Sequence, residues 1–168
     1  MPLGTDYATQ HCAISRTLEV VGERWTLLIV RDLFYGIRRY SDMKKHIGLP
    51  PATLTSRLNG LVEEGLVERV PAASGRDEYA LTEKGASLWP IVSSLAQWGS
   101  ENYVDADCRM SYTHRGCGPI GRTGACENCG MFPAASRIDV QRGDGVTEDV
   151  FAQALRREPH PLMEPLRV

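Results

Sequence analysis

Residues 48–51, Gly-Leu-Pro-Pro, constrain the fold most, because glycine readily ends a helix and proline does not fit a helix interior. The preceding segment DMKKHI, residues 42–47, has its apolar residues four apart, and Ser41 is suited to cap that helix. After the turn, Pro51 suits the first turn of a new helix over residues 52–64, which carries leucines on one face. The sequence therefore predicts two short helices joined by a tight turn.

The segments around this helix pair extend the pattern. Helical spacing predicts helices over residues 12–22 and 24–36, and strand candidates follow at 66–70 and 78–81, joined by a loop that carries Arg76. Helix, turn, helix and two strands in this order are typical of a winged helix-turn-helix, so the predicted fold class is α+β and mainly α. A small packing unit without any DNA role has the same periodicity and stays open as the alternative.

A long helix is predicted from Thr82 to about Tyr103, with a kink at Pro90. Its apolar stripe consists of Leu88, Ile91, Val92, Leu95 and Trp98. One small domain does not easily cover that much apolar surface, so the stripe favours a partner.

The net charge of −2 does not favour nucleic acid, but basic residues gather locally. Between residues 38 and 57 the sequence has several basic residues but a single acidic residue, Asp42. A solvated basic face is the alternative interpretation. On a helix in the major groove, hydroxyl and amide side chains can bond to base edges, and arginine can grip guanine or phosphate. The candidate DNA-contacting residues are Arg38, Arg39, Ser41, Lys44, Thr53, Thr55, Ser56, Arg57, Asn59 and Arg76.

Residues 12–103 closely resemble the HxlR family of bacterial winged-helix transcription regulators, which are relatives of the MarR type. Besides Cys12, the resemblance rests on four segments. They are GERWTLLIVRDL at 22–33, RRYSDMKKHI at 38–47, LTSRLNGLVEEGLVER at 54–69 and YALTEKG at 79–85. The sequence departs from the family at Pro50, where serine is frequent as the N-cap.

The resemblance implies a cytoplasmic homodimer, in which the first helix and the long helix after the wing form most of the interface. Such a pair binds a pseudopalindromic operator, usually as a repressor, and responds to a small molecule or to a redox or electrophile signal. Cys12 matches the cysteine that senses oxidants or electrophiles in some members. A helix N-terminus also raises thiol reactivity. The alternative is that Cys12 packs as a small hydrophobe.

Four residues in the last third have the spacing of a metal site, H-x2-C-x8-C-x2-C: His114, Cys117, Cys126 and Cys129. Three thiolates and one imidazole complete a tetrahedral shell for Zn²⁺ with no open position, which predicts a structural role. Gly118 and Gly130 follow two of the cysteines and would let the chain turn. Free thiols or a redox-active pair are the alternatives for these four residues. Of the two cysteines outside the cluster, Cys108 is a weaker candidate for sensing than Cys12.

An enzyme is not expected. Zinc deaminases need H-x-E, and His114 is followed by Arg115 and Gly116. A thioredoxin-like CxxC would need a βαβ context, which is lacking around Cys126. The alternatives to a DNA-binding regulator are therefore a protein-interaction module built on the zinc ribbon, and a metal or redox sensor whose reactive centre is the Cys/His cluster.

The sequence predicts a division near residue 104. The expected parts are a winged helix-turn-helix with long dimerisation helices at 1–104, a small zinc-ribbon-like module at 105–146, and a short helix with a loosely held tail at 147–168. A strand is expected at 136–140. No apolar run is long enough for a membrane span and the N-terminus does not read as a signal peptide, so a cytoplasmic protein without a membrane partner is expected.

Overall fold

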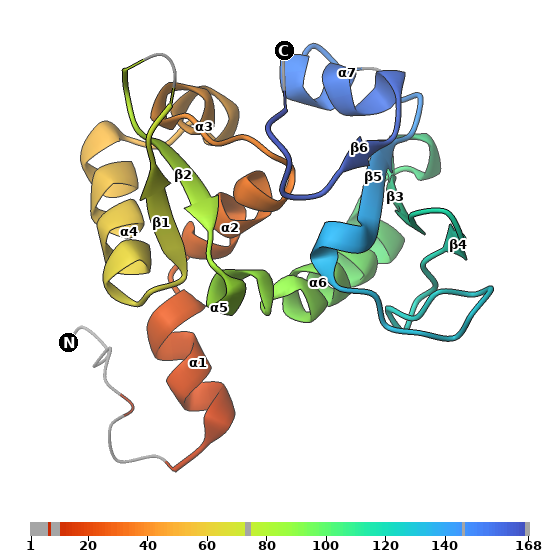
Figure 1. Cartoon of the computed structure of the whole chain (residues 1–168), viewed down its shortest axis with the longest axis horizontal. Helices are drawn as coiled ribbons and strands as arrows, with labels where there is room; N and C mark the ends of the chain where they lie inside the picture. The colour runs from red at the N-terminus through yellow and green to blue at the C-terminus, as the bar shows by residue number, and fades with distance from the viewer. Residues whose placement is uncertain (1–6, 8–10, 73–74, 146, 167–168) are drawn as a thin grey trace.

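The structure is a computed structural model that describes residues 7, 11–72, 75–145 and 147–166. Its N-terminal half contains α1 (Ala13–Val21), α2 (Thr26–Phe34), α3 (Tyr40–Ile47), α4 (Pro51–Glu63), β1 (Val67–Val70) and β2 (Glu78–Leu81). β1 and β2 pair antiparallel, with Val67 opposite Leu81. This order confirms the winged helix-turn-helix, and Figure 1 shows the β1–β2 hairpin beside α4.

The start of α3 differs from the prediction. The helix begins at Tyr40, and its N-cap is Arg39, which makes no side-chain capping bond. Ser41 lies inside the first turn, where its hydroxyl donates to Asp42 Oδ1 at 3.2 Å. The α3–α4 turn follows the prediction: Gly48 ends α3 with a φ of 74° and Pro51 lies in the first turn of α4.

The single long helix predicted after the wing is wrong, because the segment forms two helices. Thr82 caps α5 (Glu83–Ala86), accepting from the Gly85 amide at 3.1 Å, and α6 (Trp89–Tyr103) follows after a break. Pro90 lies in the first turn of α6. A proline there lacks only an N–H that has no helical partner, so Pro90 starts a helix instead of kinking one.

The C-terminal part is built on a four-stranded antiparallel sheet in the order β4-β3-β5-β6. Its helices and strands are η1 (Ala106–Cys108), β3 (Met110–His114), β4 (Gly118–Pro119), η2 (Ala135–Arg137), β5 (Ile138–Arg142), α7 (Val150–Arg157) and β6 (His160–Pro161). The tail strand β6 thus pairs with β5, so residues after 147 share a sheet with the Cys/His segment. In Figure 1 this sheet and α7 lie on the far side of α2 from the wing.

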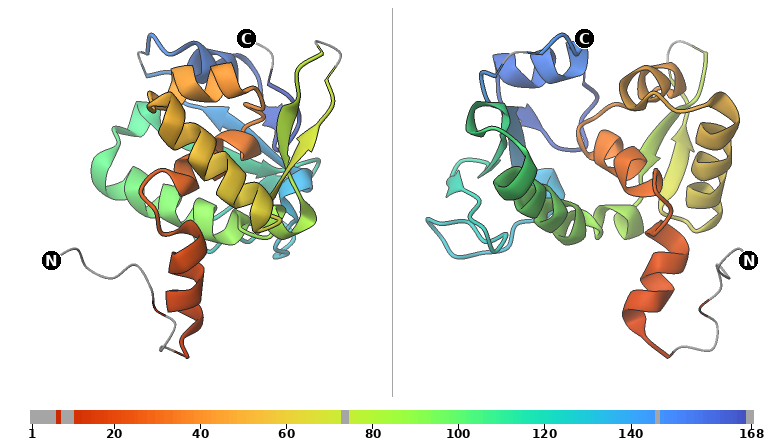
Figure 2. Two further views of the ribbon diagram at one scale, coloured as in Figure 1. Left: turned by 90° about the vertical axis from the view of Figure 1, so that its left-hand side faces the viewer. Right: turned by 180° about the vertical axis from the view of Figure 1, so that it is seen from behind.

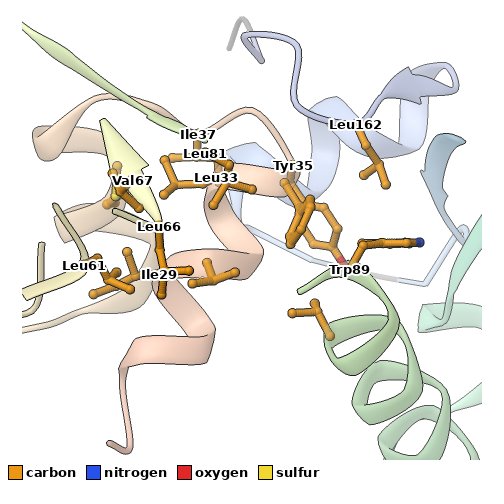
Figure 3. Close-up of a cluster of buried hydrophobic side chains, with 14 of the residues drawn as sticks. Ile29, Leu33, Tyr35, Ile37, Leu61, Leu66, Val67, Leu81, Trp89 and Leu162 are labelled. Carbon is orange, nitrogen blue, oxygen red and sulfur yellow. The ribbon is translucent and has the colours of Figure 1, made fainter. Parts of the chain in front are cut away.

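One continuous apolar core joins the two parts (Figure 3). Trp89 at the start of α6 is its central ring. The ring lies 5.2 Å from Phe34 of α2 and 5.2 Å from Tyr112 of β3, edge-on to both. Such edge-to-face pairs contribute about 1 kcal/mol each beyond area burial. The C-terminal sheet is therefore packed onto the winged helix and not merely tethered to it.

The prediction of a loosely held tail is wrong. The Met163 amide donates to the Phe34 carbonyl at 2.6 Å, the Leu166 amide donates to the Gly36 carbonyl at 2.9 Å, and the side chain of Leu162 is buried. Gly36 permits this contact, because a Cβ there would lie 1.8 Å from the Glu164 carbonyl oxygen. The tail is therefore held by backbone hydrogen bonds and by the burial of Leu162.

Gly36→Ala tests the docked tail. Gly36 and Gly48 both have positive φ, 81° and 74°, but an added Cβ meets no neighbour at Gly48. Both alanine variants therefore carry the left-handed backbone penalty, and only Gly36→Ala displaces the tail. We expect Gly36→Ala to lower the free energy of unfolding by about 2 kcal/mol more than Gly48→Ala does, because Leu162 becomes exposed. Equal losses in urea unfolding would contradict this account.

Within the described residues, no helix is both long and apolar enough to cross a bilayer.

Candidate DNA interface and metal cluster

The outer face of α4 carries the short polar side chains that the sequence predicts. Leu54 and Leu58 are fully buried in the core, and α4 packs against β1. Thr55 and Ser56 are exposed and Thr53 is half-buried. Burial of one leucine face therefore turns a hydroxyl-rich face to solvent.

Tyr40 ties the two helices of the helix-turn-helix together. Its hydroxyl donates to the Pro51 carbonyl at 2.9 Å and lies 3.1 Å from Thr55 Oγ1. The first turn of α4 is thereby held on the first turn of α3. Thr55 is thus exposed but already engaged, whereas Ser56 next to it is the freer hydroxyl.

An open cavity of about 550 Å³ separates the start of α3 from the wing and is lined by Arg39, Tyr40, Ser41, Arg76 and Asp77. It brings Arg76 of the wing together with two candidate residues at the start of α3, Arg39 and Ser41. Arg39 Nε lies 3.0 Å from Glu78 Oε1, an exposed ion pair that is readily exchanged for another anion. Lys44 is exposed on α3 as well.

The structure places two other candidate arginines elsewhere. The Arg38 guanidinium donates to the Met163 carbonyl of the docked tail. Arg57 Nη2 lies 3.0 Å from Glu23 Oε2, and Arg57 Nε is buried without a hydrogen-bond partner among the described residues. Each side chain would have to leave its present position to reach DNA.

Sequence reasoning overlooked Arg69 of β1. Its Nη2 donates to Asn59 Oδ1 at 2.8 Å, and its guanidinium lies 6.0 Å from the Tyr79 ring across the wing strands. The contact joins the wing to α4 and occupies the Asn59 side chain. Strand alternation could not reveal this contact, because residues two apart share a face and Arg69 would be placed beside the buried Val67.

The Cys/His cluster forms as the spacing predicts. Ligand atoms of His114, Cys117, Cys126 and Cys129 all lie within 4.8 Å of one another. Cys126 Sγ is 3.6 Å from Cys117 Sγ, and Cys129 Sγ is 3.5 Å from His114 Nδ1. Tetrahedral zinc with sulfur bonds of about 2.3 Å holds two sulfurs about 3.8 Å apart, so these separations fit a metal.

The turns that shape the cluster differ slightly from the prediction. Gly116 and Gly130 have a φ of 72°, whereas Gly118 does not have a positive φ. A Cβ at Gly118 would lie 2.4 Å from Asn128 Cγ, so this glycine is needed for close approach. The Asn128 amide donates to the Cys117 carbonyl at 2.7 Å and links the two halves of the cluster.

Cys126 is the thiol best prepared for metal binding. Burial raises its pKa, but the backbone amides of Cys129 and Asn128, with His114 and Cys117, outweigh burial and lower the pKa to about 6. The Cys117 pKa is raised to about 11, because its thiol is hydrogen-bonded to the side chains of Cys126 and Cys129. Metal ligation needs thiolates, and the cluster favours one at neutral pH.

Similarity to known proteins identifies the family of this chain. The sequence profile of the HxlR-like helix-turn-helix family matches residues 20–107. The chain belongs to the HxlR-like family. Two HTH-type transcriptional regulators, Mb3122 of Mycobacterium bovis and Rv3095 of Mycobacterium tuberculosis, are each 40% identical over 137 residues, which cover 79% of this chain and 87% of theirs. A match of that length must extend past residue 107 into the Cys/His segment.

Two solved structures are similar to this HxlR-like chain. PA1607, a candidate transcription factor, is 32% identical with a TM-score of 0.54, covering 88% of this chain and 96% of its own. The redox regulator HypR in its oxidised form is 28% identical with a TM-score of 0.50, covering 54% of this chain and 97% of its own. The HxlR-like protein described here is accordingly a DNA-binding transcriptional regulator and not an enzyme.

Cys12 of this HxlR-like regulator lies exposed at the N-cap of α1. The backbone amide of Ser15, together with the Ser15 hydroxyl and the Ile14 amide, lowers the pKa of the Cys12 thiol. The neutral thiol makes no capping bond, so the effect comes from stabilising the thiolate.

Large apolar side chains remain exposed on α1 and α6. Ile14 is 71% exposed and Trp98 is 58% exposed, and Leu18, Ile91 and Leu95 join them. Figure 2 shows α1 extending away from the rest of the chain. An apolar surface of this kind on a projecting helix indicates a protein partner.

Proposed function

We propose that the protein is a homodimeric repressor that binds a pseudopalindromic operator in double-stranded DNA and releases it in response to a chemical signal. The hydroxyl face of α4, beside a cavity lined by Arg39, Ser41 and Arg76, is the observation that carries the proposal. Selection of bound sequences from random DNA tests it and provides the operator for the assays below.

The proposed contacts divide by chemistry. Thr53, Thr55 and Ser56 on α4 face the base edges of the major groove, where small hydroxyls permit close approach. Arg39, Ser41 and Lys44 contact phosphates, and Arg76 at the wing contacts the backbone or the minor groove. Asn59, Arg38 and Arg57 contact DNA only after leaving Arg69, Met163 and Glu23.

The proposed dimer interface is formed by α1 and α6. Trp98→Lys should convert the dimer to a monomer and lower operator affinity at least about tenfold, because burying an unpaired ammonium in an apolar interface is unfavourable. Phe132→Lys is the matched control, since Phe132 is 72% exposed on the metal-cluster loop. Light scattering gives the mass. A monomeric Phe132→Lys or a dimeric Trp98→Lys would argue against this interface.

The proposed signal acts on Cys12. Similarity to HypR, a redox regulator, and the lowered pKa of an exposed thiol support a redox or electrophile response. We expect Cys12→Ser to bind the operator as tightly as the wild type and to stay bound after diamide treatment, whereas the wild type dissociates. Equal dissociation of both would exclude Cys12 as the sensor and leave a small-molecule effector as the signal.

We assign structural Zn²⁺ to the Cys/His cluster. His114, Cys117, Cys126 and Cys129 supply a closed donor set, and the separations between their ligand atoms match tetrahedral bonds. The metal would hold together a glycine-rich loop in which only Cys126 is buried among these ligands. A zinc-ribbon interaction module or a metal or redox sensor would use the same four residues.

A further inference from the structure

A second cavity, of about 300 Å³, lies where the C-terminal sheet and α7 meet α2 and α6. Its walls include Arg31 and Tyr35 near the end of α2, His46 of α3, Arg109 and Arg142 of the sheet region, and Asp149 before α7. Arg109, Arg142 and Asp149 lie beyond the part of the chain that the family profile matches. The cavity therefore belongs to the junction between the helix-turn-helix and the extension.

Positive charge is in excess in this cavity. Arg31 is neutralised by the fully buried Asp32 at 2.7 Å, and Asp149 Oδ2 lies 3.1 Å from His46 Nε2. Arg109 and Arg142 donate to backbone carbonyls, Val104 at 3.2 Å and Gly145 at 3.0 Å. Among the described residues neither has a carboxylate partner. Two guanidinium groups with spare N–H donors thus face a space suited to an anion.

The rest of the lining is mixed, with the hydroxyl residues Ser100 and Thr147 beside apolar side chains. Val104, Met110, Ala152 and Leu155 contribute hydrocarbon surface. A site that combines arginines with aliphatic walls suits an organic anion with an apolar body better than a fully hydrated inorganic ion. A cavity of about 300 Å³ is large enough for a small carboxylic acid.

A chain of side-chain contacts connects this cavity to the helices of the helix-turn-helix. His46 Nε2 lies 3.1 Å from Asp149 Oδ2, and His46 Nδ1 lies 2.9 Å from Asp32 Oδ2. Asp149 also accepts from the Phe151 amide at 3.0 Å and caps α7. A ligand that moves Arg31 or Asp149 therefore changes contacts that position α3 on α2.

We propose that this cavity binds a small organic carboxylate, and that the bound anion shifts α3 and so weakens operator binding. The second half rests on the proposed DNA-binding function. The carboxylate accepts from Arg109 and Arg142 while its apolar body lies against Met110 and Leu155. Differential affinity for the two positions of α3 supplies the coupling.

Cys108 lines the same cavity and reports its occupancy. The test measures alkylation of Cys108 by N-ethylmaleimide with mass spectrometry, in the presence of benzoate, hexanoate or the neutral benzamide. At about 10 mM, enough to fill a millimolar site, benzoate or hexanoate should slow Cys108 alkylation about tenfold. Benzamide should not, and the rate at the exposed Cys12 should stay unchanged. Protection by benzamide equal to benzoate, or by neither carboxylate, would overturn the proposal.

Arg142→Ala should raise the concentration of carboxylate needed for protection about tenfold, because a charge-assisted hydrogen bond is lost. Arg115→Ala is the control, since Arg115 is exposed, pairs with Asp139 at 2.8 Å and lies outside the cavity. Equal effects of both variants would refute an arginine-bound anion. Operator affinity is measured separately. If the protein without carboxylate does not bind the operator, only the proposed function is refuted. If carboxylate protects Cys108 but leaves operator affinity unchanged, the coupling between the cavity and α3 is refuted.

Discussion

Replacing Cys126 by serine should remove the metal and unfold the loop that the cluster closes. Cys126 is the buried member, its sulfur lies 3.6 Å from Cys117 Sγ, and its pKa of about 6 makes it the readiest thiolate. A structural zinc site supplies roughly 10 kcal/mol or more of binding free energy to a small domain. Few apolar contacts replace it, because Met131 and Phe132 beside the cluster are exposed.

Metal analysis and limited proteolysis measure this effect. Wild type should hold one zinc per chain, Cys126→Ser should hold almost none, and cleavage should appear between residues 115 and 134. Cys108→Ser is the matched control, because it changes a cysteine outside the cluster. Zinc at full occupancy in Cys126→Ser would contradict the assignment. A Cys117–Cys126 disulfide without zinc would favour the redox pair, and loss of operator affinity on zinc removal from a folded chain would favour the metal sensor.

Ser56→Glu should abolish specific DNA binding while leaving the fold intact. Ser56 is exposed on α4 between the buried Leu54 and Leu58, so the substitution leaves the core unchanged. The substitution removes the serine hydroxyl that donates to a base edge, and the new carboxylate repels the DNA phosphates. Together these effects amount to about 3 kcal/mol, or roughly a hundredfold loss of affinity.

Ser136→Glu is the control for Ser56→Glu. It adds the same charge at an exposed position in the C-terminal part, so the change in net charge is identical. Fluorescence anisotropy with the selected operator should give wild-type affinity for Ser136→Glu. Equal losses in both variants would mean that net charge and not the α4 face governs binding. Unfolding in urea checks that both variants remain folded.

The helix-turn-helix could be predicted from the sequence because its signals are local. Leucine spacing predicts the buried face of α4, Gly48 and Pro51 predict the turn, and two short runs joined by a loop predict the wing strands. The docked tail could not be predicted. It depends on backbone bonds to Phe34 and on the absence of a side chain at Gly36, which no short-range pattern encodes.

In the candidate sites, too, local patterns could be predicted from the sequence and long-range contacts could not. The Cys/His cluster could be predicted from its spacing, because the ligands of each pair are separated by one short turn. The positions of the candidate arginines were harder to predict, because their partners come from distant segments. Arg57 meets Glu23 of the α1–α2 connection, and Arg38 meets the tail carbonyl of Met163. Arg69 was overlooked because its link to Asn59 joins a strand to a helix.

Hydroxyl-radical footprinting of the operator selected from random DNA tests the central claim most directly. A homodimer with α4 of each copy in the major groove should protect two inverted half-sites whose centres lie about 10 base pairs, one helical turn, apart. Protection should disappear with Ser56→Glu and weaken steeply as salt is raised. Selection that enriches no inverted repeat, or a footprint unchanged by Ser56→Glu, would contradict a sequence-specific regulator that reads DNA through α4.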